Sequence, residues 1–289
     1  MTSGIPIKEK IVKHTARTCL VLFVLLLAAH AFEAIVLRMD ETVFAENFLN
    51  KLFGIAVLVV ALRVLGWRFR DIGLSKAGAV KGALIGAALA TASFTVAFCI
   101  EIMLLKGLGR RVGIGFYAAG FSLTGDPIVQ TGAGYLLLCV LFNLLNVFME
   151  EGIFRGLFDG ILCMDHSSKA AMLIGSFLFG VWHLATPLHH LIDGDLDLFA
   201  FLGLGLGYMA LSGVMGIKWS LLYRMTGNLS CGMADHFFNN CIATNLLHVV
   251  TETGVDEWMT VRVLIAQILS FAIVVAVWIK RWRTDCPNV

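Results

Sequence analysis

The residues of this sequence whose types and spacing could do chemistry lie together in one apolar segment. Two adjacent carboxylates, Glu150 and Glu151, are followed by Arg155. An ionisable side chain inside a membrane span is costly, so it marks a candidate functional site. On a helix Glu151 and Arg155 are four residues apart and can pair, whereas Glu150 points about 100° away from Glu151. Asn146, one turn earlier, could donate a hydrogen bond to Glu150. A desolvated carboxylate without its own cation suits a general base, and we expect this role for Glu150.

Two further segments carry polar side chains where apolar ones are expected. His183 ends one apolar run, and His236 and Asn240 are four residues apart on one helix face. If the chain folds antiparallel about the turn 165–168, Glu150 and His183 each lie about 16 residues, or ~24 Å, from the middle of the turn. A helical hairpin therefore predicts that these two side chains lie at the same depth.

Each of these residues taken alone has a structural explanation. A single His or Asn in a span is most often a hydrogen-bond partner between helices, and a Glu/Arg pair four residues apart is most often a structural ion pair. Two acids, two histidines and an asparagine on three apolar segments are hard to explain by packing, because each one costs stability. The combination predicts a polar reaction site inside a membrane bundle.

The composition indicates which elements must hold such a site. The 289 residues are 58% hydrophobic and 15% charged, with a mean hydropathy of +0.85, whereas about a quarter of the residues in a soluble domain are charged. The sequence therefore predicts an all-α, multi-pass membrane bundle in contact with a lipid bilayer. The net charge of +2 gives no argument for a nucleic-acid partner, and no cysteine pair has the CxxC spacing of a metal site.

A helix that crosses a bilayer needs about 20 mostly apolar residues. The sequence offers eight such segments: 18–37, 47–66, 82–105, 133–163, 168–186, 198–223, 228–248 and 261–279. We expect about eight transmembrane helices in a single integral membrane domain, 1–289, with a motif-bearing core at about 133–248. The fourth segment is too long for a simple crossing and should be tilted or extend past the membrane. The first should be an uncleaved span rather than a signal peptide.

Loop charges predict the orientation, because short cytoplasmic loops are rich in Lys and Arg. Basic and acidic connections alternate: the N-terminus, loop 67–81 and the connection with Lys218 and Arg224 are basic, and loops 187–197 and 249–260 are acidic. This alternation places both termini in the cytoplasm, with an even number of spans. Loop 106–132 is basic where it should be outside, and we expect it to be re-entrant or interfacial.

The three motifs together resemble those of the CPBP intramembrane protease family, which includes the CAAX prenyl endopeptidases and the bacterial Abi proteins. Segment 150–155 matches the family's EExxxR motif, segment 179–183 matches FxxxH, and segment 236–240 matches HxxxN. Each motif alone is unspecific, but all three in this order on apolar segments are a strong signal. The motifs cover about residues 140–245. For the first three spans and the eighth, the resemblance is supported only by the number of predicted spans.

The resemblance implies an intramembrane endopeptidase that hydrolyses a peptide bond of a membrane-associated peptide or protein, and we expect it in a bacterial plasma membrane. On this chain, Glu150 and His183 would activate a water molecule. His236 and Asn240 would stabilise the oxyanion of the tetrahedral intermediate. These roles agree with the residue types, because a carboxylate and an imidazole can share proton transfer, and positioned donors can oppose a developing negative charge.

The same resemblance gives Glu151 and Arg155 the role of holding the shape of the site. The involvement of a metal stays open at this point. Glu150, His183 and His236 could form a His₂Glu zinc site with an open fourth position, as in a metalloprotease. A glutamate mechanism without any cofactor fits the same three residues.

Two other classes of function compete with the protease. A non-catalytic membrane protein of the same fold, such as an immunity factor or scaffold, would use these residues for structure. A transporter could use the buried Glu and His side chains as a proton relay, although the chain shows no inverted repeat or paired broken helices. A Glu150→Gln change separates the three classes, because it should abolish cleavage, leave a scaffold intact, or alter a pH-coupled flux.

Overall fold

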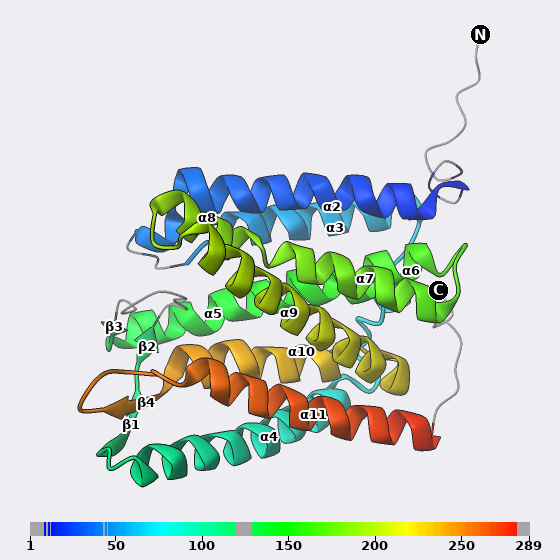
Figure 1. Ribbon diagram of the computed structural model, residues 1–289. Helices are drawn as coiled ribbons and strands as arrows, with labels where there is room; N and C mark the ends of the chain where they lie inside the picture. Colours follow the sequence, from blue (N-terminus) through cyan, green and yellow to red (C-terminus); the bar gives the residue numbers. More distant parts are fainter. Residues whose placement is uncertain are drawn as a thin grey trace.

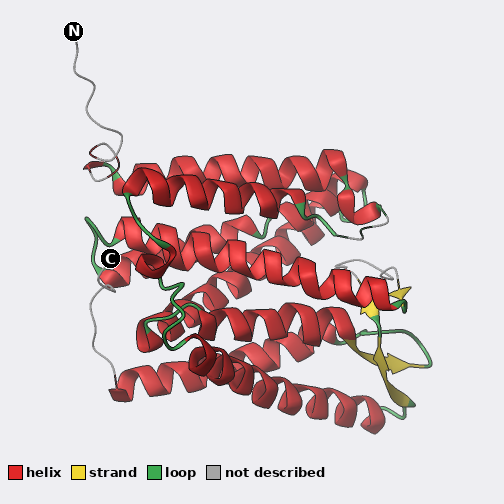
Figure 2. Cartoon of the chain, turned by 180° about the vertical axis from the view of Figure 1, so that it is seen from behind, coloured by secondary structure: helices red, strands yellow, loops and turns green. Residues whose placement is uncertain are grey.

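The chain folds into a bundle of helices with short β-strands at one end. The structure is a computed structural model, which describes residues 9, 11, 13–42, 44, 46–119 and 129–281. The helices run side by side along a common direction, except for one that crosses the others diagonally (Figure 1). The strands gather at one end of the bundle (Figure 2).

The helical elements are α2 (Thr15–Phe32), η1 (Glu33–Leu37), η2 (Met39–Glu41), α3 (Leu49–Leu65), η3 (Phe69–Ile72), α4 (Ala79–Gly107), α5 (Ala133–Glu150), η4 (Glu151–Phe158), α6 (Asp159–Leu162), α7 (Ser168–Trp182), α8 (Ala185–Asp193), α9 (Leu198–Thr226), α10 (Ser230–Phe237), η5 (Phe238–Leu246) and α11 (Met259–Arg281). The strands are β1 (Val112–Phe116), β2 (Ala118–Ala119), β3 (Val129–Gln130) and β4 (Leu247–Thr251). The diagonal helix is α9 (Figure 1).

All eight predicted apolar segments are helical, close to their predicted bounds. Within the described residues, six helical segments are long and apolar enough to cross a membrane, which confirms the all-α, multi-pass bundle. The other two predicted spans are shorter helices. Helix α3 has 17 residues, or ~25 Å, against a hydrocarbon core of ~30 Å, and α10 gives way to η5 after 8 residues. The count of eight crossings stays a prediction.

The first and last helices of the described residues share one end of the bundle. The start of α2 and the end of α11 lie at the same end of the bundle (Figure 1), as an even number of crossings requires. The side of the membrane on which they lie stays a prediction. The terminal residues 1–8 and 282–289 lie outside the described residues.

The fourth predicted span is one continuous helical segment that changes its winding. It runs through α5, η4 and α6 for 30 residues, or ~45 Å at the rise of an α-helix, so in a hydrocarbon core of ~30 Å it must be tilted or extend past it, as predicted. The predicted turn follows it. Ser167 is the N-cap of α7 and its hydroxyl accepts a hydrogen bond from the backbone N–H of Ala170 at 3.3 Å. The helical hairpin expected from the sequence is therefore present.

Two short antiparallel sheets were not predicted. Strand β1 pairs with β4, with Ile114 opposite Val249, and β2 pairs with β3. The basic loop 106–132 thus contributes strands to the end of the bundle, and its residues 120–128 lie outside the described residues. The period-2 pattern is weak in β1, which has two glycines among its five residues, and a two-stranded sheet needs support from neighbouring elements.

The assignment of Lys218 and Arg224 to a basic connection is wrong. Both belong to α9, which runs to Thr226, and both side chains are buried. Lys218 pairs with Asp235 at 2.5 Å, and Arg224 pairs with Asp159 at 2.8 Å. A cation inside a membrane bundle is stable only with such a partner. These two residues therefore give no information on orientation.

Candidate active site

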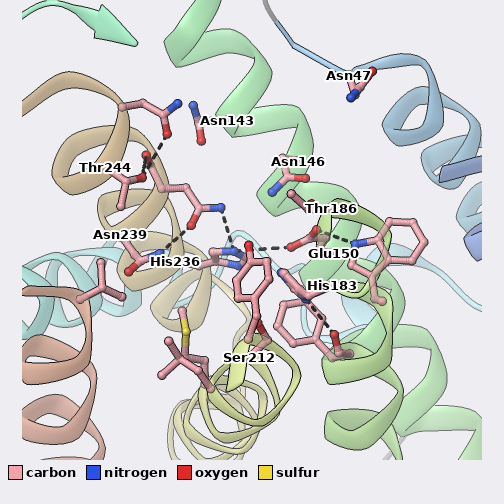
Figure 3. A pocket seen from close by; sticks show the side chains of 18 of the residues that line it. Asn47, Asn143, Asn146, Glu150, His183, Thr186, Ser212, His236, Asn239 and Thr244 are labelled. Carbon is pink, nitrogen blue, oxygen red and sulfur yellow. Dashed lines mark hydrogen bonds and ion pairs between the residues drawn. The ribbon is translucent and has the colours of Figure 1, made fainter. Parts of the chain in front are cut away.

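A cavity of about 630 Å³ brings the three motifs together. Helices α5, α7, α9 and α11 contribute to its wall, together with α10 and η5. Glu150, His183, His236 and Asn240 all line this cavity (Figure 3). The predicted equal depth of Glu150 and His183 is confirmed, since both side chains reach the same space.

Glu150 reaches the cavity from the end of α5. Its side chain is 4% exposed, and its Oε1 accepts a hydrogen bond from the indole Nε1–H of Trp182 at 3.0 Å. This donor, rather than the predicted Asn146, holds the carboxylate, although Asn146 lines the same cavity. Among the described residues, Oε2 of Glu150 has no hydrogen-bond partner, and it lies 3.5 Å from Nε2 of His236. Oε1 of Glu150 is therefore held by Trp182, and Oε2 lies near Nε2 of the His236 ring.

Glu151 points away from the cavity and forms the support behind it. Its Oε1 lies 3.3 Å from Nη1 of Arg155 and accepts the Nδ1–H of His236 at 3.0 Å, so the predicted pairing of Glu151 with Arg155 is confirmed. The Arg155 guanidinium lies 3.8 Å from the ring centre of Phe179 and 5.1 Å from that of Trp219. These cation–π contacts and the carboxylate hold the buried cation in place.

The helix type changes between the two adjacent glutamates. Helix α5 ends at Glu150 and the π-helical segment η4 begins at Glu151. A second π-helical segment, η5, begins at Phe238, two residues after His236. π-helical turns are rare and occur often at functional sites. Both segments that carry the acidic and the HxxxN motif thus depart from regular α-winding at the site.

His183 follows the last turn of α7 and faces the cavity. Its Nδ1–H donates to the backbone carbonyl of Phe179 at 2.8 Å, and since a carbonyl can only accept, the neutral ring carries its proton on Nδ1. Nε2 is then an acceptor. The ring also makes an edge contact with Tyr208 at 5.1 Å between ring centres. His183 therefore offers the cavity a lone pair rather than a hydrogen.

His236 is held on both nitrogens and on one face. Its Nδ1–H donates to the Glu151 carboxylate, and its Nε2 accepts a hydrogen bond from Nδ2 of Asn240 at 3.1 Å. Trp219 stacks on the imidazole with 3.9 Å between ring centres and 14° between planes. The ring is therefore fixed in position, and its neutral form carries the proton on Nδ1.

The spacing of the predicted zinc ligands does not fit a zinc ion. Ligand atoms of a tetrahedral zinc site lie ~2.0–2.1 Å from the metal, so they must come close to one another. Glu150, His183 and His236 are not among the described groups of three or more potential ligands whose atoms all lie within 4.8 Å. Both Nε2 atoms are free of protons, as metal ligands require, but the three donors do not converge as placed. We therefore assign no step to a metal here.

A different group of side chains, outside the cavity, has the close spacing that a metal ion requires. Glu41, His189 and Asp193 have ligand atoms within 4.8 Å of one another. Arg38 donates to both carboxylates, at 3.1 Å to Glu41 and in a closer contact to Asp193. The guanidinium already supplies the positive charge that these two acids need.

Several residues of the site were missed by the sequence interpretation. Trp182 holds Glu150, Trp219 stacks on His236, and Lys218 belongs to the same polar network. The available signal was the buried cation, because a Lys inside an apolar run has a buried partner. The tryptophans carried no signal, since an aromatic residue in a span is most simply explained by packing.

Comparison with known families agrees with the motifs. Residues 132–242 match a family model described as Rce1-like, type II CAAX prenyl endopeptidase. The matched segment holds all three motifs and most of the cavity-lining elements described above. No curated protein and no solved structure matches the chain. Segment 132–242 is therefore similar to the type II CAAX prenyl endopeptidases, in agreement with the resemblance to the CPBP intramembrane protease family that the three motifs indicate.

Proposed function

We propose that the chain is an intramembrane endopeptidase in which Glu150 is the general base for a water molecule that attacks a peptide carbonyl. The substrate is a segment of a membrane-associated peptide or protein that enters the cavity. His183, His236 and Asn240 complete the reaction site. Glu151 and Arg155 hold His236 from behind and do not touch the substrate.

The observation that carries this proposal is a buried carboxylate oxygen without a partner. Among the described residues, Oε2 of Glu150 has no hydrogen-bond partner, and the lone pair of the nearby Nε2 of His236 is taken by Asn240. Buried polar atoms need hydrogen-bond partners, and a water molecule that donates a hydrogen to Oε2 would satisfy this atom. Such a water is next to a carboxylate that can take its proton.

The reaction then follows from the positions of the donors and acceptors. The water oxygen bonds to the carbonyl carbon while Glu150 takes a proton, a step that His183 assists as a second acceptor. The oxyanion accepts the second amide N–H of Asn240, because the first is held by His236. The C–N bond breaks, and the proton on Glu150 passes to the leaving nitrogen. General-base catalysis contributes ~10²–10⁴-fold and one oxyanion donor ~10²–10³-fold.

This assignment changes the expected role of His236. The sequence interpretation paired it with Asn240 as an oxyanion donor. With Nε2 accepting from Asn240, the neutral imidazole has no hydrogen to offer the cavity. We therefore propose that His236 holds the amide of Asn240 in position, and that Asn240 alone donates to the oxyanion.

Comparative peptidomics of membranes tests the proposal without knowledge of the substrate. Cells express the wild-type chain or the Glu150→Gln variant, and peptides released from their membranes are quantified. We expect a set of fragments that depends on Glu150. A fragment found in this way is then synthesised as the uncleaved peptide and incubated with the purified chain in liposomes.

The matched control is Glu41→Gln, a carboxylate-to-amide change at an exposed side chain, 54% accessible, outside the cavity. It should give the wild-type fragment set. If wild type and Glu150→Gln release the same peptides while both are inserted in the membrane, the hydrolase proposal is refuted, and a non-catalytic role of this fold takes its place.

A further inference from the structure

A single row of hydrogen bonds leads from a buried lysine to the motif residues. Nζ of Lys218 donates to Oε1 of Gln267 at 2.6 Å, and Nε2 of Gln267 donates to Oδ1 of Asn239 at 2.9 Å. Nδ2 of Asn239 donates to Oδ1 of Asn240 at 2.7 Å, and Nδ2 of Asn240 donates to Nε2 of His236 at 3.1 Å. Figure 3 shows the part of this row that borders the cavity. The row then ends at Glu151 through Nδ1–H of His236.

The lysine end of this row sets its direction. An ammonium group has three hydrogens and no acceptor. Nζ of Lys218 has three acceptors, at 2.5 Å on Asp235, 2.6 Å on Gln267 and 3.1 Å on Ser270. Gln267 must therefore present its oxygen to the lysine, which turns its amide nitrogen toward Asn239. Asn239 must then accept from Gln267 and donate to Asn240, and Asn240 must accept from Asn239 and donate to His236.

The glutamate end imposes the same direction independently. An ionised carboxylate can only accept, and Glu151 is ionised beside Arg155. The same oxygen, Oε1, faces Arg155 at 3.3 Å and His236 at 3.0 Å, so Nδ1 of His236 must carry the hydrogen of that contact, and Nε2 accepts from Asn240. The lysine end and the glutamate end therefore require the same direction of hydrogen bonding. Each of the five bonds in the row then joins one donor to one acceptor.

We propose that Lys218, Gln267 and Asn239 are positioning residues that fix the tautomer of His236 and the orientation of the Asn240 amide. The three come from α9, α11 and η5, so the row links distant parts of the chain to the motif residues. In this orientation, Nδ2 of Asn240 donates one of its two hydrogens to Nε2 of His236, and the other hydrogen is available to a ligand in the cavity. The consequence for catalysis rests on the proposed function, whereas the tautomer is a property of the protein alone.

Nitrogen NMR of the histidine rings tests the tautomer directly. The full-length chain in lipid nanodiscs carries ¹⁵N in the rings of its eight histidines, and His236→Gln identifies the His236 signals by their loss. Protonated and unprotonated ring nitrogens have well-separated shifts. We expect the His236 proton on Nδ1 in the wild-type chain. A proton on Nε2 overturns the proposal, and this measurement depends on no relay variant.

Gln267→Glu tests whether the distant residues cause this state. The new carboxylate still accepts from Lys218 but cannot donate to Asn239, so the amides of Asn239 and Asn240 turn over. The oxygen of Asn240 then faces Nε2 of His236. Because Glu151 still requires the hydrogen on Nδ1, we expect a second proton on Nε2, which makes the ring an imidazolium. Ser270→Ala is the matched control, since it removes another acceptor of Lys218 and leaves the row intact. Ring signals of Gln267→Glu that equal those of the wild type refute the relay.

The same variants separate this inference from the proposed function. On a peptide that the wild-type chain cleaves, Gln267→Glu should lower kcat by ~10²–10³, the worth of one oxyanion donor, with KM unchanged. Ser270→Ala should leave kcat unchanged. A wild-type chain that cleaves no peptide refutes the hydrolase and leaves the tautomer result standing, whereas a His236 proton on Nε2 refutes the relay and leaves Glu150 as the base.

Discussion

Replacement of Glu150 by Gln should lower activity without lowering stability. The new side chain keeps an oxygen for the Trp182 indole, now at 3.0 Å, and places an N–H where Oε2 lies 3.5 Å from Nε2 of His236. One buried charge without its own cation is lost, and the new N–H finds the Nε2 lone pair of His236 already held by Asn240. The free energy of unfolding should therefore stay level or rise by about 1 kcal/mol, the worth of a net hydrogen bond.

The same Glu150→Gln change should strongly lower the rate of peptide turnover. Removal of a general base costs ~10²–10⁴ in rate, which is ~3–5 kcal/mol of barrier at about 1.36 kcal/mol per tenfold. Peptide turnover in liposomes measures the rate, and titration of the reconstituted chain with sodium dodecyl sulfate measures the unfolding free energy. Tryptophan fluorescence follows the unfolding, since Trp182 and Trp219 border the site.

The adjacent residue supplies the matched comparison. Glu151→Gln takes the negative charge from a buried Arg155 whose side chain is 1% exposed. Breaking one side of a buried ion pair costs ~3–5 kcal/mol. Two neighbouring Glu→Gln changes should thus have opposite effects on stability. The reasoning fails if Glu150→Gln loses more than about 1 kcal/mol, or if Glu151→Gln unfolds as easily as the wild type, given the worth of a net hydrogen bond.

Three further outcomes are expected. Arg262→Met should lose ~3–5 kcal/mol in the same titration, because it leaves Glu101, now 2.9 Å from the guanidinium, as a buried charge; the double change with Glu101→Gln should recover part of the loss, and additive losses would contradict this. Burial raises the pKa of Asp256, but the His248 hydrogen bond, the Arg262 charge and a backbone N–H outweigh it, so the pKa lies below its ordinary 3.8. The stability that wild type gains over Asp256→Asn should be complete above pH 3.8 and decline as the pH falls through the folded-state pKa; an advantage that grows toward acid pH would contradict it. Removal of divalent metals with a chelator should leave peptide turnover unchanged, whereas a loss that added zinc restores would show that Glu150 and the two histidines draw together around a metal.

The sequence predicted the helical segments because their signal is local. Each apolar run is long, and ~1.5 Å per residue fixes how far a helix reaches from a turn. That arithmetic was enough to bring Glu150 and His183 to one cavity. The spacing of four residues was also enough to pair Glu151 with Arg155. These features depend on single helices or on one hairpin.

The missed features depend on contacts between elements distant in the chain. Lys218 was counted with the loop charges although it lies inside the predicted span 198–223, because its partners Asp235 and Gln267 come from two other elements and cannot be seen in a local pattern. Asn146 was a reasonable donor for Glu150 on one helix, but Trp182 from α7 takes that place. Strand β1 pairs with β4, with Phe116 opposite Leu247 and Val112 opposite Thr251, and no short window of sequence can show a partner so distant in the chain.

The π-helical segments η4 and η5 give the site an unusual dependence on chain length. A π-turn holds about one residue more than an α-turn, so loss of a single residue from η4 can return it to ordinary winding without turning the elements beyond it. The same loss from the regular part of α5 would rotate everything beyond by about 100° on the helix axis. Single-residue deletions should therefore separate the base from its supports when they fall in α5 and be absorbed better when they fall in η4, a difference that point changes do not show.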